Sequence, residues 1–275
     1  GQRSLRSEMH FSDERQVRYM SLGLQYKDDR HIFDEAGGNV PYLEYPMLRE
    51  TGIIRHGFST RLGGVSEGCW ASMNLSFERG DRPEAVMENF RRIGAELGVR
   101  CEDMVLSQQT HTANVRVVTG ADRGKGITRE RDYTDVDGLI TNEPGICLVT
   151  SFADCVPLYF VDPVKKAIGL SHSGWRGTVG KIGKRTVEMM GESFGPDPAD
   201  ILAAVGPSAC MDCYEVSGDV IEKFRQVFDE KLWPELFYEK ENGKCQLDLW
   251  KANELIFLES GILPEHMAVT NLCTH

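Results

Sequence analysis

Three side chains that can bind a metal ion stand beside short apolar runs. Cys155 comes after one run and directly after Asp154. His172 comes after a second run, and His111, in SQQTHTANV, lies beside a third. Thiolate and neutral imidazole are good zinc ligands, and a catalytic zinc usually takes three protein ligands and leaves one position open. We therefore predict a metal site made of His111, Cys155 and His172, with His56 as the reserve ligand.

The same atoms suit two other roles, and sequence spacing does not decide between them. With Cys155 as nucleophile and His172 as its base, the protein would be a hydrolase or an amidase. A zinc ion with a filled fourth position would only hold the fold, and the protein would then be a nonenzymatic one that acts through a partner. Ligands so far apart in the chain have no diagnostic pattern, so all three interpretations stay open.

Two arginines beside glycine-containing turns are candidates for binding an anion. Arg61 lies in STRLGG and Arg176 in HSGWRGT. The planar donor fork of arginine suits phosphate or carboxylate, and glycine lets the backbone approach such a group closely. A helix opening at Gly177 would add free N–H groups beside Arg176. We predict that these arginines bind phosphate.

Further polar side chains complete the candidate site. Asp154 is the candidate for proton transfer, because it precedes Cys155 directly. The candidates for orienting a substrate are Asn74, Gln109 and Glu215. Residues of these types are also common in caps and turns, so each has an ordinary structural alternative.

Charge and composition restrict the class of partner and the compartment. The chain has 31 Lys and Arg against 42 Asp and Glu, a formal charge of −11 that repels nucleic acid and anionic membranes. We therefore expect a small soluble substrate. No apolar run is long enough to cross a bilayer, and the start lacks the apolar centre of a secretory signal, which favours a cytoplasmic protein. The sequence does not predict the oligomeric state.

Eight cysteines without an export signal indicate reduced thiols or metal ligands rather than disulfides. CMDC at residues 210–213 is half of a zinc or redox motif, and no second CxxC or HxxxH supplies the other half. We interpret it as structural.

Alternating strands and helices must position these residues. Strands are predicted at residues 55–60, 114–118, 137–141, 146–150, 157–161 and 167–171 from their β-branched and aromatic content. One helix is predicted from Asp81, as cap, to Gly98, with others over residues 179–194, from Ser217 and from Asp248. Residues 1–20 are treated as an N-terminal extension, because the opening Gly1 suggests an expression remnant or a processed start. Residues 21–275 are expected to form one domain.

The ordered motifs HGFSTRLGGVSEG, QQTH, DGLIT, ADCVPLYFVD, LSHSGWRGT, VGPSACMDCYEV and NLCT resemble the YfiH family, also called DUF152 or the multicopper polyphenol oxidase laccase-like family. The resemblance runs from about His56 to Cys273. It implies a four-layer α/β/β/α sandwich, whereas alternation alone would suggest a single doubly wound sheet. It also implies a zinc-dependent purine nucleoside phosphorylase, as in the related FAMIN, acting on adenosine, inosine, guanosine or methylthioadenosine, and in some members adenosine deamination.

The family's zinc ligands match His111, Cys155 and His172, and its two motif arginines match Arg61 and Arg176. Two departures from the family stand out. Asn89-Phe90 replaces the usual asparagine-arginine pair, and relatives continue beyond NLCTH into an arginine-containing segment, so any substrate residue from that tail is left unassigned.

Two alternatives come from other family names. Copper could occupy a Cys/His site in a polyphenol oxidase, since Cu²⁺ binds such ligands more tightly than Zn²⁺. A multicopper enzyme needs many histidines, however, and only three of the seven here are well placed. The label peptidoglycan editing factor implies action on cell-wall precursors, which would suit the hydrolase or amidase interpretation.

Overall fold

The computed structural model describes residues 22–275, so the predicted extension at residues 1–20 lies outside the described residues. The strands are β1 (Asp34–Ala36), β2 (Tyr42–Glu44), β3 (Phe58–Ser59), β4 (Met104–Leu106), β5 (Val115–Val117), β6 (Gly138–Thr141), β7 (Cys147–Val149), β8 (Val156–Asp162), β9 (Ala167–Ser173), β10 (Leu202–Val205), β11 (Glu215–Val216), β12 (Phe237–Glu239), β13 (Cys245–Leu247) and β14 (Met267–Val269). The α-helices are α1 (Pro46–Arg49), α2 (Pro83–Leu97), α3 (Trp175–Val179), α4 (Ile182–Phe194), α5 (Gly218–Val227), α6 (Trp233–Leu236) and α7 (Leu249–Glu259).

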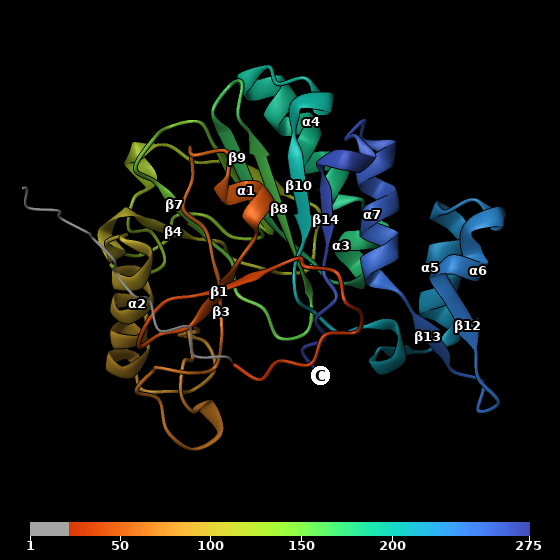
Figure 1. Cartoon of the computed structure of the whole chain (residues 1–275), viewed down its shortest axis with the longest axis horizontal. Helices are drawn as coiled ribbons and strands as arrows, with labels where there is room; N and C mark the ends of the chain where they lie inside the picture. Colours follow the sequence, from red (N-terminus) through yellow and green to blue (C-terminus); the bar gives the residue numbers. More distant parts are fainter. Residues whose placement is uncertain (1–21) are drawn as a thin grey trace, which may run out of the picture.

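A six-stranded mixed sheet in the order β14-β10-β8-β9-β6-β5 forms the centre of the molecule. Its longest pair is antiparallel, with Val156 opposite Ser173 and Asp162 opposite Ala167. Helices α3, α4 and α7 cover one face (Figure 1). Buried side chains of β8 alternate between the two faces, as the two-residue period of a strand requires: Leu158 and Phe160 face the helices, and Tyr159 and Val161 face the other way.

Two small sheets form a second layer on that other face. Sheet β1-β2-β3 packs against it through Leu43, and the parallel pair β4-β7 does so through Val105 and Leu148. The alternate residues of β4 and β7 point outward to α2, where Val86 and Phe90 complete a further core. The layers follow one another as helices, the six-stranded sheet, the two small sheets and helix α2. This is the predicted α/β/β/α sandwich, and it excludes a single doubly wound sheet.

Most predicted elements are confirmed, with shifted ends. Helix α2 ends at Gly98, whose φ of 65° gives the left-handed cap that glycine adopts without strain. The Asp81 cap is wrong, because Arg82 is the N-cap residue and no side chain caps it. The carboxylate of Asp81 instead accepts hydrogen bonds from Ser66 and Asn74. The helix predicted over residues 179–194 is interrupted, since Lys181 at φ 53° separates α3 from α4.

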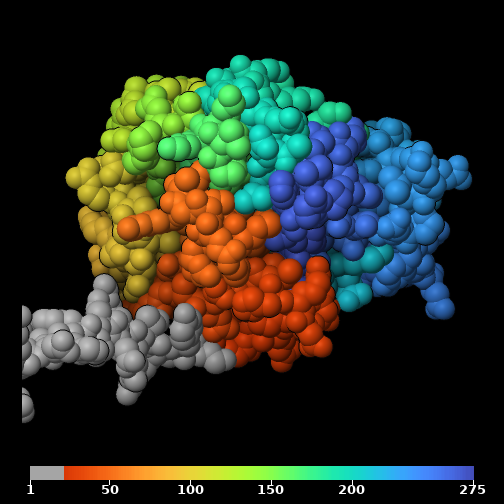
Figure 2. All heavy atoms as spheres, turned by 45° about the horizontal axis from the view of Figure 1, so that its top comes forward, coloured from red at the N-terminus to blue at the C-terminus, as the bar shows by residue number. Residues whose placement is uncertain are grey.

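Segments from opposite ends of the chain lie side by side. Tyr26 forms an antiparallel bridge with Leu272, and the Lys27 N–H donates to the Asn271 carbonyl at 2.8 Å. Figure 2 shows the residues near the N-terminus, in red, bordering those near the C-terminus, in blue. None of the helices in residues 22–275 is long and apolar enough to cross a membrane.

Candidate metal centre

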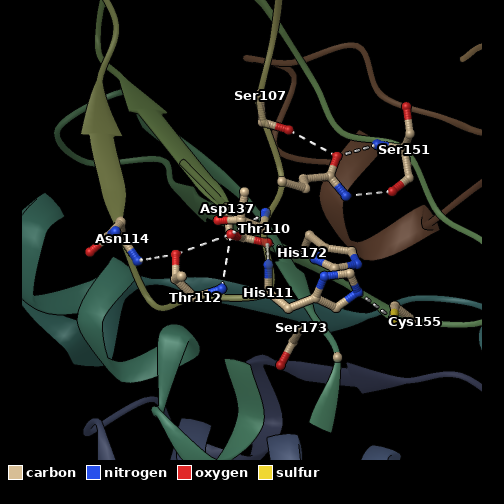
Figure 3. A network of polar contacts seen from close by, with 12 residues as sticks. Ser107, Thr110, His111, Thr112, Asn114, Asp137, Ser151, Cys155, His172 and Ser173 are labelled. Carbon is tan, nitrogen blue, oxygen red and sulfur yellow. Dashed lines mark hydrogen bonds and ion pairs between the residues drawn. The ribbon is translucent and has the colours of Figure 1, made fainter. Parts of the chain in front are cut away.

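The fold brings His111, Cys155 and His172 together. Cys155 directly precedes β8, His172 lies near the end of β9, and the antiparallel pairing sets Pro157 opposite His172. The loop before β5 carries His111 to the same edge, where its Nε2 lies 4.0 Å from the Cys155 Sγ (Figure 3). One ligand atom from each residue lies within 4.8 Å of the others. Zinc bonds of about 2.0–2.3 Å to nitrogen and sulfur span such separations.

A buried carboxylate that the sequence analysis missed organises two of these ligands. Asp137, which directly precedes β6, is fully buried. Its Oδ1 accepts from His172 Nδ1 at 2.9 Å and from the His111 N–H at 3.1 Å (Figure 3). Its Oδ2 accepts the N–H groups of Thr110 and Thr112, each at 3.0 Å. Because Nδ1 is held by Asp137, the His172 Nε2 is left for the metal group. A carboxylate placed at the start of a buried strand was the signal available in the sequence.

The surroundings shift the pKa values of the two histidines in opposite directions. Burial lowers the pKa of His172, but hydrogen bonds to Asp137 and Cys155 outweigh it and raise that pKa to about 9. Burial, His172, Arg176 and Arg79 together lower the pKa of His111, and Asp137 opposes them only in part. The site therefore contains a buried carboxylate, which acts mainly on His172, and the positive charges of two arginines, which act on His111.

Backbone strain is concentrated at this edge of the sheet. Of the five non-glycine residues with positive φ in residues 22–275, His111 at 67°, Asp135 at 57° and Asp154 at 72° lie beside the group. Such conformations are uncommon outside glycine, and they persist where surrounding contacts hold them. Asp135 is held by the Thr110 hydroxyl and by the Asn114 amide.

The two arginines predicted to bind phosphate, Arg176 and Arg61, lie in different surroundings. Arg176 stacks over Trp175, with 4.4 Å from the guanidinium carbon to the ring centre, and it and Arg79 act on His111. Arg79 was not predicted from the sequence. Among residues 22–275 neither Arg176 nor Arg79 has an acidic ion-pair partner. Arg61 donates to the Ala71 carbonyl at 3.2 Å, and no hydrogen bond of the described residues links it to the metal group.

Asp154 directly precedes Cys155, and Gln109 lies shortly before His111, but both side chains form their hydrogen bonds with other loops. The Asp154 carboxylate accepts from the Thr274 hydroxyl at 2.7 Å. The Gln109 side-chain amide accepts from the Ser107 hydroxyl and the Ser151 N–H and donates to the Ser151 carbonyl, so it ties the loop of Cys155 to the loop of His111.

The other two substrate candidates form contacts of their own. Asn74 donates to Asp81 at 3.0 Å and accepts the Ser76 N–H. Glu215 pairs with Lys240 at 2.6 Å and Lys244 at 2.8 Å, and these ammonium groups lower its pKa to about 2.

Arg91 and Arg92, which follow the departure at Asn89-Phe90, both pair with Glu88. Arg92 also donates to the Gly63 carbonyl at 3.0 Å, in the loop that carries Arg61. Asn89 itself is fully buried, and its side chain accepts the Val65 N–H at 2.8 Å.

Two aromatic side chains that sequence analysis missed flank the group. The Phe152 ring lies 5.6 Å from the His172 ring, on the loop that leads to Cys155. Tyr214 lies close enough to Cys155 and Arg176 for both to affect it; burial first, and then Cys155, raises its pKa to about 12. Both rings offer flat apolar faces beside the candidate ligands.

His56, the reserve ligand, lies in another environment. Its Nε2 accepts the Tyr45 N–H at 2.8 Å, and its ring packs near Tyr45 and Tyr159. Burial, followed by the charge of Arg49, lowers its pKa to about 4. The Nε2 of His56 is therefore engaged in a backbone hydrogen bond, and the imidazole is neutral at pH 7.

His56 should make the protein sensitive to acid. Its pKa is lower in the folded chain than the unfolded value of about 6.5, so its contribution to stability is present above about pH 6.5 and is lost as the pH falls towards 4. The loss is at most about 3 kcal/mol. We expect urea unfolding at several pH values to show this trend in the wild type and a weaker one in His56→Gln; a difference between the two that does not vary with pH would contradict the assignment.

Comparison with known proteins agrees with the motifs and the fold. A family model described as multi-copper polyphenol oxidoreductase laccase matches residues 55–275. Purine nucleoside phosphorylase YlmD of Bacillus subtilis is 38% identical over 79% of this chain and 78% of its own length. Adenosine deaminase RL5, from an unknown prokaryotic organism, is 34% identical over 79% of this chain and 83% of its own.

The crystal structure of YlmD from Geobacillus stearothermophilus has a TM-score of 0.80 at 34% identity, covering 89% of this chain and 90% of that one. Family model, sequence identity and fold thus agree over most of the chain. This chain therefore belongs to the family described as multi-copper polyphenol oxidoreductase laccase, the YfiH family that its motifs resemble.

Proposed function

We propose that this protein is a zinc-dependent purine nucleoside phosphorylase that cleaves adenosine, inosine, guanosine or methylthioadenosine with phosphate. The observation that carries the proposal is the group His111, Cys155 and His172 with the unpaired arginines Arg176 and Arg79 beside it. A cation-rich edge in a chain of charge −11 indicates an anionic substrate. The relative named purine nucleoside phosphorylase YlmD supplies the substrate class.

The donor set fits zinc. One thiolate and two imidazoles are ligands that zinc prefers, and within residues 22–275 the group has three members, whereas structural zinc sites usually have four. The fixed His172 ring and the strained His111 backbone hold the ligands in place. When bound, zinc would act as a Lewis acid and lower the pKa of water, chemistry that deamination of adenosine requires.

Phosphorolysis requires the chain to hold two reactants in line. Arg176, with Arg61 as the second candidate, would bind phosphate so that one of its oxygens faces the ribose C1′. The C1′–O bond forms as the C1′–N9 bond breaks, giving the purine, which takes up a proton, and ribose 1-phosphate, or 5-methylthioribose 1-phosphate when the substrate is methylthioadenosine. Asp154 is the proposed group for moving that proton. Phe152 and Tyr214 offer faces against which a purine can stack, with Asn74, Gln109 and Glu215 as further candidate contacts.

Deamination of adenosine is the second candidate activity, because a relative with 34% identity is named adenosine deaminase. It converts adenosine and water into inosine and ammonia without phosphate. The two activities are therefore separable by their need for phosphate.

The test is to incubate zinc-loaded protein with each nucleoside, with and without phosphate, and to separate the products. Phosphate-dependent release of free base, absent from Cys155→Ala, is the expected result, and inosine formed from adenosine reports deamination. Intact nucleosides under all conditions would overturn the proposal and favour the cell-wall hydrolase or nonenzymatic alternatives. Copper-loaded protein assayed with a polyphenol tests the oxidase alternative.

Removing the Arg176 guanidinium should weaken phosphate use selectively. A charge-assisted hydrogen bond contributes about 1.5–3 kcal/mol, so Arg176→Ala should lower kcat/KM for phosphate about 10- to 100-fold. Arg185→Ala is the matched control, because Arg185 pairs with Glu192 at 3.2 Å on α4 and should leave kcat/KM unchanged. Equal phosphate kinetics in the two variants would remove Arg176 from the site.

A further inference from the structure

A second group of sulfur atoms lies apart from the candidate metal centre. Cys210 and Cys213 belong to the CMDC motif around a 3-10 helix, Met211–Cys213, and Cys273 lies near the end of the described chain. One ligand atom from each lies within 4.8 Å of the others. The fold thus supplies the partner that spacing did not reveal, 63 residues after Cys210.

Backbone pairing fixes the three thiols relative to one another. Ser208 and Cys273 form a parallel bridge, and the Thr274 N–H donates to the Ser208 carbonyl at 3.2 Å. The Cys213 N–H closes a turn onto the Cys210 carbonyl at 3.0 Å. In Figure 1 the C-terminus lies close to the red segment at the start of the described chain.

A backbone donor points at one of these sulfurs, and a lysine pairs with the motif between them. The Cys210 N–H donates to the Cys273 Sγ at 3.3 Å. The Lys27 ammonium donates to the carboxylate of Asp212, which lies between Cys210 and Cys213 in the chain, at 3.1 Å. An N–H donor beside sulfur favours thiolate, which is the form that binds a metal.

We propose that Cys210, Cys213 and Cys273 form a second metal site, which binds a thiophilic divalent cation of the zinc class. A Cys-x-x-Cys pair plus a distant cysteine is a frequent arrangement of zinc ligands, and sulfur ligands select zinc over hard cations. The three thiols supply three corners of a tetrahedron and leave the fourth for solvent or another ligand. A disulfide would use two of the three thiols and leave the third without a role.

The second site lies against the first through the Asp154 turn. The Ala209 N–H donates to the Asp154 carbonyl at 3.0 Å, and the Thr274 hydroxyl donates to its carboxylate at 2.7 Å. Ala209 and Thr274 are the chain neighbours of Cys210 and Cys273. A cation bound by the three thiols would therefore join the two segments that support the turn before Cys155.

The test is a count of zinc in reduced protein loaded with Zn²⁺ and desalted without oxygen. The wild type should retain about two zinc ions per chain and Cys213→Ser about one. In a His111→Ala, His172→Ala variant, which lacks the first site, about one should remain and should be lost when Cys213→Ser is added. Cobalt in place of zinc should give this variant a thiolate charge-transfer band that disappears with the same change. Cys69→Ser, at an exposed cysteine, is the control and should change neither count.

Wild type that retains only one zinc, or a count that Cys213→Ser does not change, would overturn the second site. A disulfide among these cysteines in the reduced, zinc-loaded protein, found by peptide mapping, would overturn it as well and assign the group to redox chemistry. Counting zinc in Cys213→Ser with the first site intact keeps the test valid even if the histidine variant does not fold.

Discussion

Cys155→Ala is expected to abolish nucleoside cleavage and to remove the zinc ion at the first site. The substitution deletes the sulfur that lies 4.0 Å from His111 Nε2 and leaves two imidazoles to hold the metal. Changing a residue that only orients a ligand costs about 10- to 100-fold in metal affinity or activity, so loss of a ligand should exceed about 100-fold. Zinc titration against a chromophoric chelator and a product assay on the same preparation measure both losses.

Cys101→Ala is the matched control for this change. Cys101 is also a free cysteine, but it is buried in the core beside α2, so its loss should reduce stability and leave zinc content intact. If Cys155→Ala kept zinc but lost activity, Cys155 would act as a nucleophile rather than a ligand. If it kept both, Cys155 would have no part in the site.

Local patterns predicted the elements well where one face of an element is buried. Val86, Phe90 and Ile93 recur at helical spacing in α2, and each is buried as that spacing predicts. The alternation within β4 and β7 is too short to indicate which sheet each strand joins. Their position in a second layer depends on contacts with both α2 and β6, which lie far away in the sequence. That layer was predicted only through the family resemblance.

The candidate metal centre was likewise predictable only in part from the sequence. Residue type and position at strand ends singled out His111, Cys155 and His172, and the fold brings them together. Asp137 was missed because its role depends on where the His111 loop returns to β6. Arg79 was missed for a similar reason, since its effect on His111 acts across space and no spacing encodes it.

Asp137→Asn is expected to weaken zinc binding about 10- to 100-fold and to lower the free energy of unfolding by about 3 kcal/mol. Burial raises the pKa of Asp137, but hydrogen bonds from His172 and from backbone N–H groups outweigh it and hold that pKa below its usual value. The carboxylate is therefore ionised, and it accepts hydrogen bonds on both oxygens. Zinc titration and urea unfolding measure the two losses independently.

Rotation of the new amide cannot rescue this variant. One carboxylate oxygen accepts from His172 and the His111 N–H, and the other accepts from Thr110 and Thr112, so either orientation sets an NH₂ group against at least two donors. Asp29→Asn is the control: the same chemical change, at an exposed side chain that accepts no hydrogen bond within residues 22–275, should leave zinc affinity unchanged. Wild-type zinc affinity in Asp137→Asn would mean that packing, for example of Phe152 against the His172 ring, orients the ligands without the carboxylate.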